Sequence, residues 1–220
     1  MDAYEHLYNA PDINMIIDGI NEMFLKTNKN MFSACHGRYH TMFVIDKVEY
    51  ILNSLSYDSR TIELGKIAAL LHDIGNIAGR WNHAVKSSVL AKVFFDGSDH
   101  LLPEEKSMIV QAIEDHSDGN NLSSAIGAAL LIADKSDISK RRILPVETID
   151  AWHENLLEIE DVGVCVYGEI ISMNFITTEA FSKELLISGY EQGFQKIMRA
   201  IKYLGCIYYF QINGMEEKFD

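Results

Sequence analysis

The sequence predicts a mainly α-helical protein with a small C-terminal unit that combines strands and a helix. Apolar residues recur at three- and four-residue spacing through about the first 140 residues, and β-rich runs appear only later. The chain has 220 residues, of which 48% are hydrophobic, enough for a sizeable core. We therefore expect a helical domain over 1–143 and an α+β appendage over 144–220.

The helical domain is expected to contain helices whose buried faces follow the apolar spacing. Pro103 is well placed at a first helical position, with Glu104 and Glu105 near the positive end of the helix dipole. The predicted helical segments run from Pro11 to about Leu25, from His40 to Leu52, up to His72, from Asn82 to Phe95, from Pro103 to His116, and from Leu122 to about Ile138.

The appendage is expected to have the order β-β-α-β after a short amphipathic helix through Trp152 and Leu156. Residues 162–167 and 170–177 are rich in β-branched residues, and Gly168-Glu169 between them fits a two-residue hairpin loop. A helix over about 178–204 should end at Gly205, and a last strand is expected over 206–211.

Polar side chains interrupt the apolar faces of five predicted helices. His72 and Asp73 directly follow the apolar residues 67–71, where an unpaired imidazole or carboxylate would cost roughly 2–7 kcal/mol or more to bury. The helical spacing turns further polar residues inward on the other helices. Together these inward-facing candidates are His40, His72, Asp73, His83, His116 and Asp134.

These six side chains predict a metal centre rather than six separate buried polar groups. Four imidazoles and two carboxylates suit iron or manganese, with nickel, cobalt or zinc as alternatives, better than Mg²⁺ or Ca²⁺, which prefer oxygen ligands throughout. Six ligands suffice for two divalent ions if one carboxylate bridges them. Asp73 is the candidate bridge, because it alone adjoins another ligand in the sequence.

The pattern resembles the HD-domain superfamily of metal-dependent phosphohydrolases, whose order is a lone His, a His-Asp pair and a later Asp. The matching positions are His40, His72-Asp73 and Asp134, within a resemblance that covers roughly residues 33–142. His83 and His116 resemble the extra ligands of the subset that binds two metals. The resemblance implies an HD-domain helical bundle in the first part of the chain.

The chain departs from many members of that superfamily at two positions. Asn76 stands where many have a lysine, which puts a phosphate contact there in doubt, and Asp115-His116 stands where cyclic-dinucleotide hydrolases have paired histidines. Their Gly-Tyr-Pro element is also missing from this sequence. The closer likeness is to small bacterial hydrolases that cleave symmetrical dinucleoside polyphosphates.

The expected function is a metal-dependent phosphohydrolase that cleaves a phosphate ester or anhydride of a nucleotide-like small molecule. Two ions would activate a hydroxide and polarise the phosphoryl oxygen, with His72 and Asp73 as the catalytic residues. Two alternatives stay open. A di-iron oxygenase of the same superfamily has a similar ligand set, and a catalytically silent nucleotide-binding regulatory module could keep the fold.

Cations near the ligands are candidates for binding the phosphate. The predicted substrate-binding residues are Lys135, Lys86 and Arg80, although a solvated helix end is the simpler interpretation of each. The same two interpretations apply to Arg141 and Arg142. His36 precedes His40 by one helical turn beside Gly37, which favours a capping or substrate-facing role over metal binding.

Charge and composition limit the expected partners. The formal net charge of −13 argues against bulk nucleic acid, because phosphate contacts need an excess of Lys and Arg, but it allows a small phosphorylated substrate. We expect no membrane association, reduced cysteines in the core and a cytoplasmic location. The appendage carries no recognisable chemistry, so shaping the pocket or forming a homodimer are its candidate roles.

Overall fold

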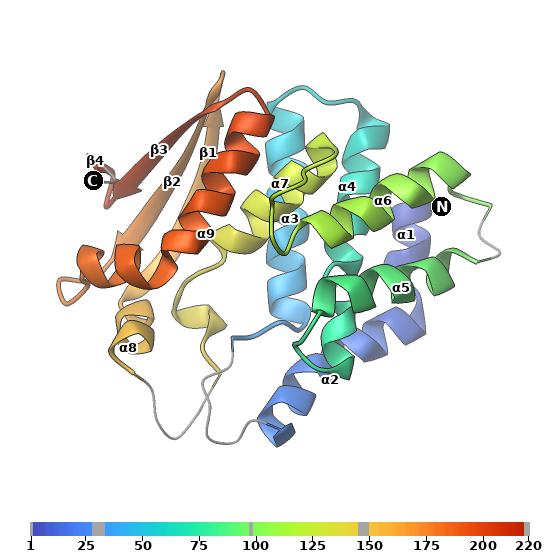
Figure 1. The fold of residues 1–220 in the computed structure, drawn as a ribbon, viewed down its shortest axis with the longest axis horizontal. Coiled ribbons are helices and arrows are strands. Elements are labelled where there is room, and N and C mark those ends of the chain that lie inside the picture. The colour runs from blue at the N-terminus through green and yellow to red at the C-terminus, as the bar shows by residue number, and fades with distance from the viewer. Residues whose placement is uncertain (1, 28–33, 97–98, 145–149, 218–220) are drawn as a thin grey trace.

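The computed structural model describes residues 2–27, 34–96, 99–144 and 150–217 of the chain. Helices make up its first part, and a small sheet follows at the C-terminal end (Figure 1). The predicted fold class, mainly α with a small C-terminal β-containing unit, is confirmed.

The helical part contains α1 to α7 and two short 3₁₀ helices, η1 and η2. Their bounds are α1 Ala3–Tyr8, α2 Pro11–Thr27, α3 Arg38–Ser54, α4 Ser59–Leu71, η1 Ile74–Ala78, α5 His83–Phe95, α6 Pro103–Asp115, α7 Ala125–Ser136 and η2 Lys140–Arg142. Helix α1 was not expected from the sequence. Helix α7 is shorter than predicted, because Ser124 caps its N-terminus by accepting from Gly127 N.

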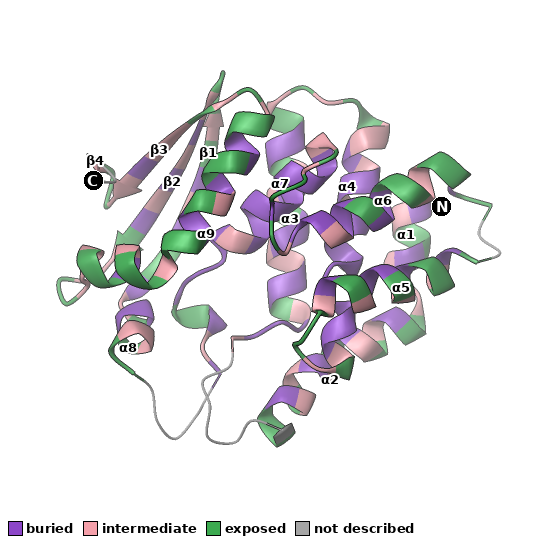
Figure 2. Cartoon of the chain, viewed as in Figure 1, coloured by how far each residue is buried: buried purple, intermediate pink, exposed green. Residues whose placement is uncertain are grey.

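Helix α7 lies at the centre of the molecule. It packs against α3, α4, α6 and α9, and every residue from Ile126 to Asp134 is buried (Figure 2). A helix that is apolar on all sides must be covered on all sides. Asp134 is therefore a buried carboxylate on a helix whose other buried residues are almost all apolar.

The C-terminal unit comprises α8 and α9 and a sheet of order β1-β2-β3-β4. Its bounds are α8 Ala151–Leu157, β1 Ile159–Tyr167, β2 Ile170–Thr177, α9 Lys183–Tyr203, β3 Ile207–Ile212 and β4 Met215–Glu217. Strands β1 and β2 form the predicted antiparallel hairpin, and β2 pairs in parallel with β3. The prediction omitted β4, which pairs antiparallel with β3 after a turn at Asn213 and Gly214.

Helix α9 lies between the sheet and the helical part (Figure 1). Its Phe194 contacts Phe175 and Phe210 of the sheet with ring centroids 6.2 and 5.6 Å apart, and α9 also packs on α7. It begins five residues later than predicted, where Ser182 caps its first turn. One hydrophobic core thus runs from the bundle into the sheet.

The three cysteines differ in burial. Cys35 is buried, but Cys165 is exposed and Cys206 is half-buried, so the expectation that all three lie in the core is wrong.

Among the described residues, no helix combines the length and the apolar character that crossing a membrane would require.

Candidate metal centre

The His72-Asp73 pair lies where the chain leaves α4. His72 follows the last residue of the helix, and Asp73 precedes η1. Gly75 then lets the start of α5 come close, because a Cβ at this position would lie 2.4 Å from Ser87 N and 2.5 Å from His83 O. This close approach places the first residue of α5, His83, beside the pair.

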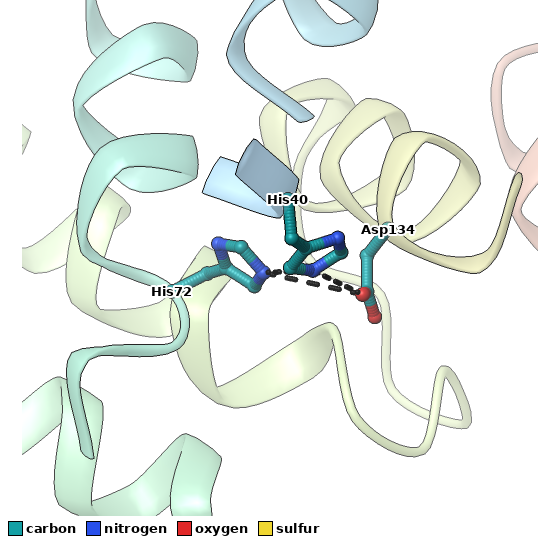
Figure 3. Close-up of side chains that lie close together, drawn as sticks. All are labelled: His40, His72 and Asp134. Carbon is teal, nitrogen blue, oxygen red and sulfur yellow. Dashed lines mark hydrogen bonds and ion pairs between the residues drawn. The ribbon is translucent and has the colours of Figure 1, made fainter. Parts of the chain in front are cut away.

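Four side chains form what we call the first cluster. The Nε2 atom of His40 lies 3.2 Å from His72 Nε2, 3.2 Å from Asp134 Oδ1 and 3.5 Å from Asp73 Oδ2. His40 comes from the first turn of α3, His72 from the end of α4 and Asp134 from the last turn of α7 (Figure 3). Three separate elements therefore converge on one point.

The second cluster consists of His83, His116 and the other oxygen of Asp73. His83 Nε2 lies 3.2 Å from His116 Nε2 and 3.5 Å from Asp73 Oδ1, and His116 Nε2 lies 4.0 Å from the same oxygen. Asp73 therefore presents one carboxylate oxygen to each cluster. All six predicted metal ligands come together, and Asp73 occupies the position of a bridge.

The spacing of these atoms fits metal binding. With metal–ligand bonds of about 2.0–2.2 Å, donors at right angles around an ion lie about 3 Å apart, close to the separations within each cluster. Neither oxygen of Asp73 has a hydrogen-bond partner, although its side chain is only 3% exposed. A buried carboxylate without partners is costly, and divalent cations on both sides would compensate it.

Hydrogen bonds to the remaining ring nitrogens orient three of the histidines. The Nδ1 atoms of His72 and His116 donate to Ala69 O at 2.7 Å and to Ile113 O at 2.5 Å. His40 Nδ1 donates to Asp137 Oδ2 at 2.8 Å. These bonds leave the Nε2 lone pairs of all three rings directed into the clusters, as in known metal sites.

Burial and local charge set the protonation of the clusters. Burial lowers the pKa of His72 and His116, and it lowers that of His83 to about 4, so these imidazoles are neutral at neutral pH. Burial alone would raise the pKa of Asp73, but the surrounding imidazoles and Arg80 outweigh it and hold the pKa well below its usual range. Neutral imidazoles and an ionised carboxylate are the forms that bind metals.

His40 differs from the other ligands in its protonation. Burial and Arg142 lower its pKa, but hydrogen bonds to Asp134 and Asp137 outweigh them, so the pKa is raised. Proton release from His40 would therefore accompany metal binding to the first cluster.

Asp137 was not predicted from the sequence, and Arg142 was predicted only as a candidate phosphate contact. Arg142 is 7% exposed, and its Nη1 donates to Asp137 O at 3.1 Å and to Asp137 Oδ2 at 3.3 Å, while its Nη2 donates to His36 Nε2 at 3.2 Å. His36 is buried and holds Arg142 rather than a metal. Asp137 could have been recognised as a neighbour of the site, because it follows the predicted ligand Asp134 by three residues.

The predicted substrate-binding cations occupy different places. Lys135 Nζ donates to Asp134 Oδ2 at 2.5 Å, and Arg80 Nη1 lies 3.9 Å from Asp73 Oδ1, so both adjoin the clusters. Lys86 Nζ instead donates to the carbonyls of Ala78 and Gly79. Arg141 pairs with Asp161 at the surface.

A cavity of about 780 Å³ adjoins the first cluster. Asp134, His36, Arg80, Lys135 and Arg142 line it on the side of the helical part. On the other side it is lined by α8 and by residues 188–193 and Lys196 of α9. Its volume falls within the range of small-molecule sites, about 300–1,000 Å³.

Comparisons with known proteins find matches among solved structures. No family model matches the chain, and no curated protein matches its sequence. The structure is similar to the crystal structure of a predicted HD superfamily hydrolase from an uncultured Thermotogales bacterium, with a TM-score of 0.44 and 23% sequence identity over 63% of this chain and 75% of that one. The assignment of the metal centre rests on the geometry of its six residues.

Proposed function

We propose that this protein is an HD-type metal-dependent phosphohydrolase that binds two divalent transition-metal ions and cleaves a phosphate ester or anhydride of a nucleotide-like small molecule. The observation that carries the proposal is the position of Asp73, with one carboxylate oxygen in each of two clusters of imidazoles. This arrangement supports two adjacent ions.

The six side chains would hold the ions, and other residues would act on the substrate. When bound, such ions supply a hydroxide at neutral pH and polarise a phosphoryl oxygen. Arg80, close to Asp73 and lining the cavity, is placed to offset negative charge on the phosphoryl oxygens. Asp137 holds His40, Arg142 holds Asp137, and Lys135 holds Asp134, so that the ligands keep their positions.

The cavity supports a phosphorylated substrate in an acidic protein. Four cationic side chains line it, Arg80, Lys135, Arg142 and Lys196, against three carboxylates, Asp134, Asp137 and Glu191. Asp134 would be neutralised by a metal ion, and Asp137 pairs with Arg142, which leaves Arg80, Lys135 and Lys196 against Glu191. The remaining charge of the cavity lining is positive and favours an anion, despite the chain's net charge of −13.

The test is phosphate release from nucleotides, dinucleoside polyphosphates and sugar phosphates by protein loaded with Mn(II) or Fe(II) and assayed without oxygen. Anaerobic turnover that disappears on chelation is the expected result. Absence of turnover with two metals bound per chain would contradict the proposal, and activity that requires oxygen would assign the centre to the oxygenase class. Absence of both metal and turnover would indicate a regulatory module.

A further inference from the structure

The cavity beside the first cluster is closed by residues that belong to the C-terminal unit. Residues 188–193 of α9 line the cavity consecutively, and Lys196 follows within the next turn, so this part of α9 forms the wall. Trp152 and Leu156 of α8 extend this wall. The part of the cavity farther from the clusters is therefore formed by a segment outside the six-ligand pattern.

A break in α9 fixes this wall against the metal centre. Tyr190 has φ −123° and ψ 17°, which is not helical, and its hydroxyl donates to Lys135 O at 3.0 Å. Lys135 is the residue after Asp134. The break thus ties α9 to the end of α7 that carries a ligand of the first cluster.

Two glycines make this packing tight. A Cβ at Gly189 would lie 1.3 Å from Trp152 Nε1, and a Cβ at Gly193 would lie 2.3 Å from Cε1 of the Tyr190 ring. No other residue fits either position without moving an aromatic side chain. The wall is a closely fitted structure, and its cavity-facing groups are held in place.

Lys196 carries the positive charge of this wall. Its side chain lines the cavity, and its Nζ donates to Ser117 O at 2.7 Å, which fixes the position of the ammonium group. Lys135 lines the same cavity, and burial and then the charge of Lys135 lower the pKa of Lys196. An anion bound between the two ammonium groups would offset the cost of burying Lys196 and the repulsion between the two positive charges.

We propose that Lys196, together with Lys135, forms a second anion-binding position in the cavity, which selects substrates with a further anionic group beyond the phosphoryl group that reacts. The substrate class is a compound with two separated anionic groups, such as a nucleoside diphosphate or a phosphorylated acid. This inference rests on the proposed function only for the location of the reacting phosphoryl group.

The test is binding, measured by calorimetry, of alkane bisphosphonates of increasing chain length to the Mn(II)-loaded protein, with methylphosphonate as the single-anion reference. Phosphonates are not hydrolysed, so the measurement is independent of turnover. The wild type should bind one chain length best. In Lys196→Gln the affinity for that compound should fall about tenfold, and the affinity for methylphosphonate should change less than about twofold.

Lys202→Gln is the matched control, because it removes the same charge from an exposed position of α9. It should leave both affinities within about twofold of the wild type, since an exposed charge is screened by solvent. Equal weakening of both ligands in Lys196→Gln, or no weakening of either, would overturn the proposal. Selective binding by a protein that hydrolyses nothing would leave this inference standing and refute the proposed hydrolase.

Discussion

The two clusters share Asp73 but differ in the number and burial of their other donors. The first cluster adds His40, His72 and Asp134, and each of them is hydrogen-bonded to a residue outside the cluster. The second adds only His83 and His116, and the His83 side chain is 13% exposed. The difference indicates a tight first position and a more open second position, where water and substrate have room to bind.

Removing the bridge should produce the largest effect. Asp73→Asn takes a charged donor from both clusters, so we expect the metal content to fall from about two ions per chain to below one. Turnover should fall by at least about 10³-fold. Elemental analysis and phosphate-release assays measure the two effects. Asp96→Asn, at the exposed end of α5, is the control, and a bridge variant that retains two ions would refute the bridging role.

Removing one donor from each cluster should separate the two positions. His83→Ala should retain about one ion per chain, because the first cluster keeps all its donors, whereas His40→Ala should lose the tightly bound ion. Metal content after dialysis against a weak chelator measures the difference. Similar losses in both variants would mean that the clusters do not differ in affinity.

The hydrogen bond to His40 should contribute to the tightness of the first position. Asp137→Asn removes the charged acceptor of His40 Nδ1, and we expect the affinity for the first ion to fall by roughly 10–100-fold. A competition titration with a chromophoric chelator measures this affinity. Asp161→Asn, which removes an exposed partner of Arg141, should leave it unchanged. An unaltered affinity in Asp137→Asn would show that the ring is held by packing alone.

Acid should destabilise the metal-free protein. His83, with its pKa lowered to about 4, and His36, His72 and His116, with pKa values also lowered by burial, take up protons on unfolding. The free energy of unfolding should therefore fall as the pH drops from about 6.5 towards 4, whereas His40, whose pKa is raised, contributes a pH dependence of opposite sign only above about 6.5. Urea unfolding at several pH values tests this, and stability that is constant or rises with acidification would contradict it.

The smallest expected effect concerns the contact between α9 and the first cluster. Tyr190→Phe removes the hydrogen bond to Lys135 O and should cost about 1 kcal/mol, which corresponds to a decrease of about 2–4 °C in Tm. Thermal unfolding measures the change, with Tyr203→Phe at an exposed position as the control. An unchanged Tm would show that packing alone positions α9.

The sequence predicted the six candidate ligands and most of the helices, because inward-facing polar residues on apolar helix faces are rare and costly. It also predicted the β-β-α-β order, since Gly168 and the runs of β-branched residues are local signals. Strand β4 was missed although Asn213-Gly214 is a strong turn signal, because only three residues follow in the strand.

Other features depend on contacts that no local pattern reveals. Arg142 and His36 bind each other across 106 positions of the chain, so neither is recognisable from its neighbours. The break at Tyr190 lies in a segment with regular helical spacing, and only its contact with Lys135 gives it a role. The cavity likewise requires two distant parts of the chain to be packed together.

The most direct test of the central claim is anomalous diffraction from crystals of the Mn(II)-loaded protein. We expect two anomalous peaks about 3.5–4 Å apart, one at each cluster, with Asp73 between them. The peak at the first cluster should have the higher occupancy. A single peak in the first cluster under saturating Mn(II), with none beside His83 and His116, would contradict the two-metal centre.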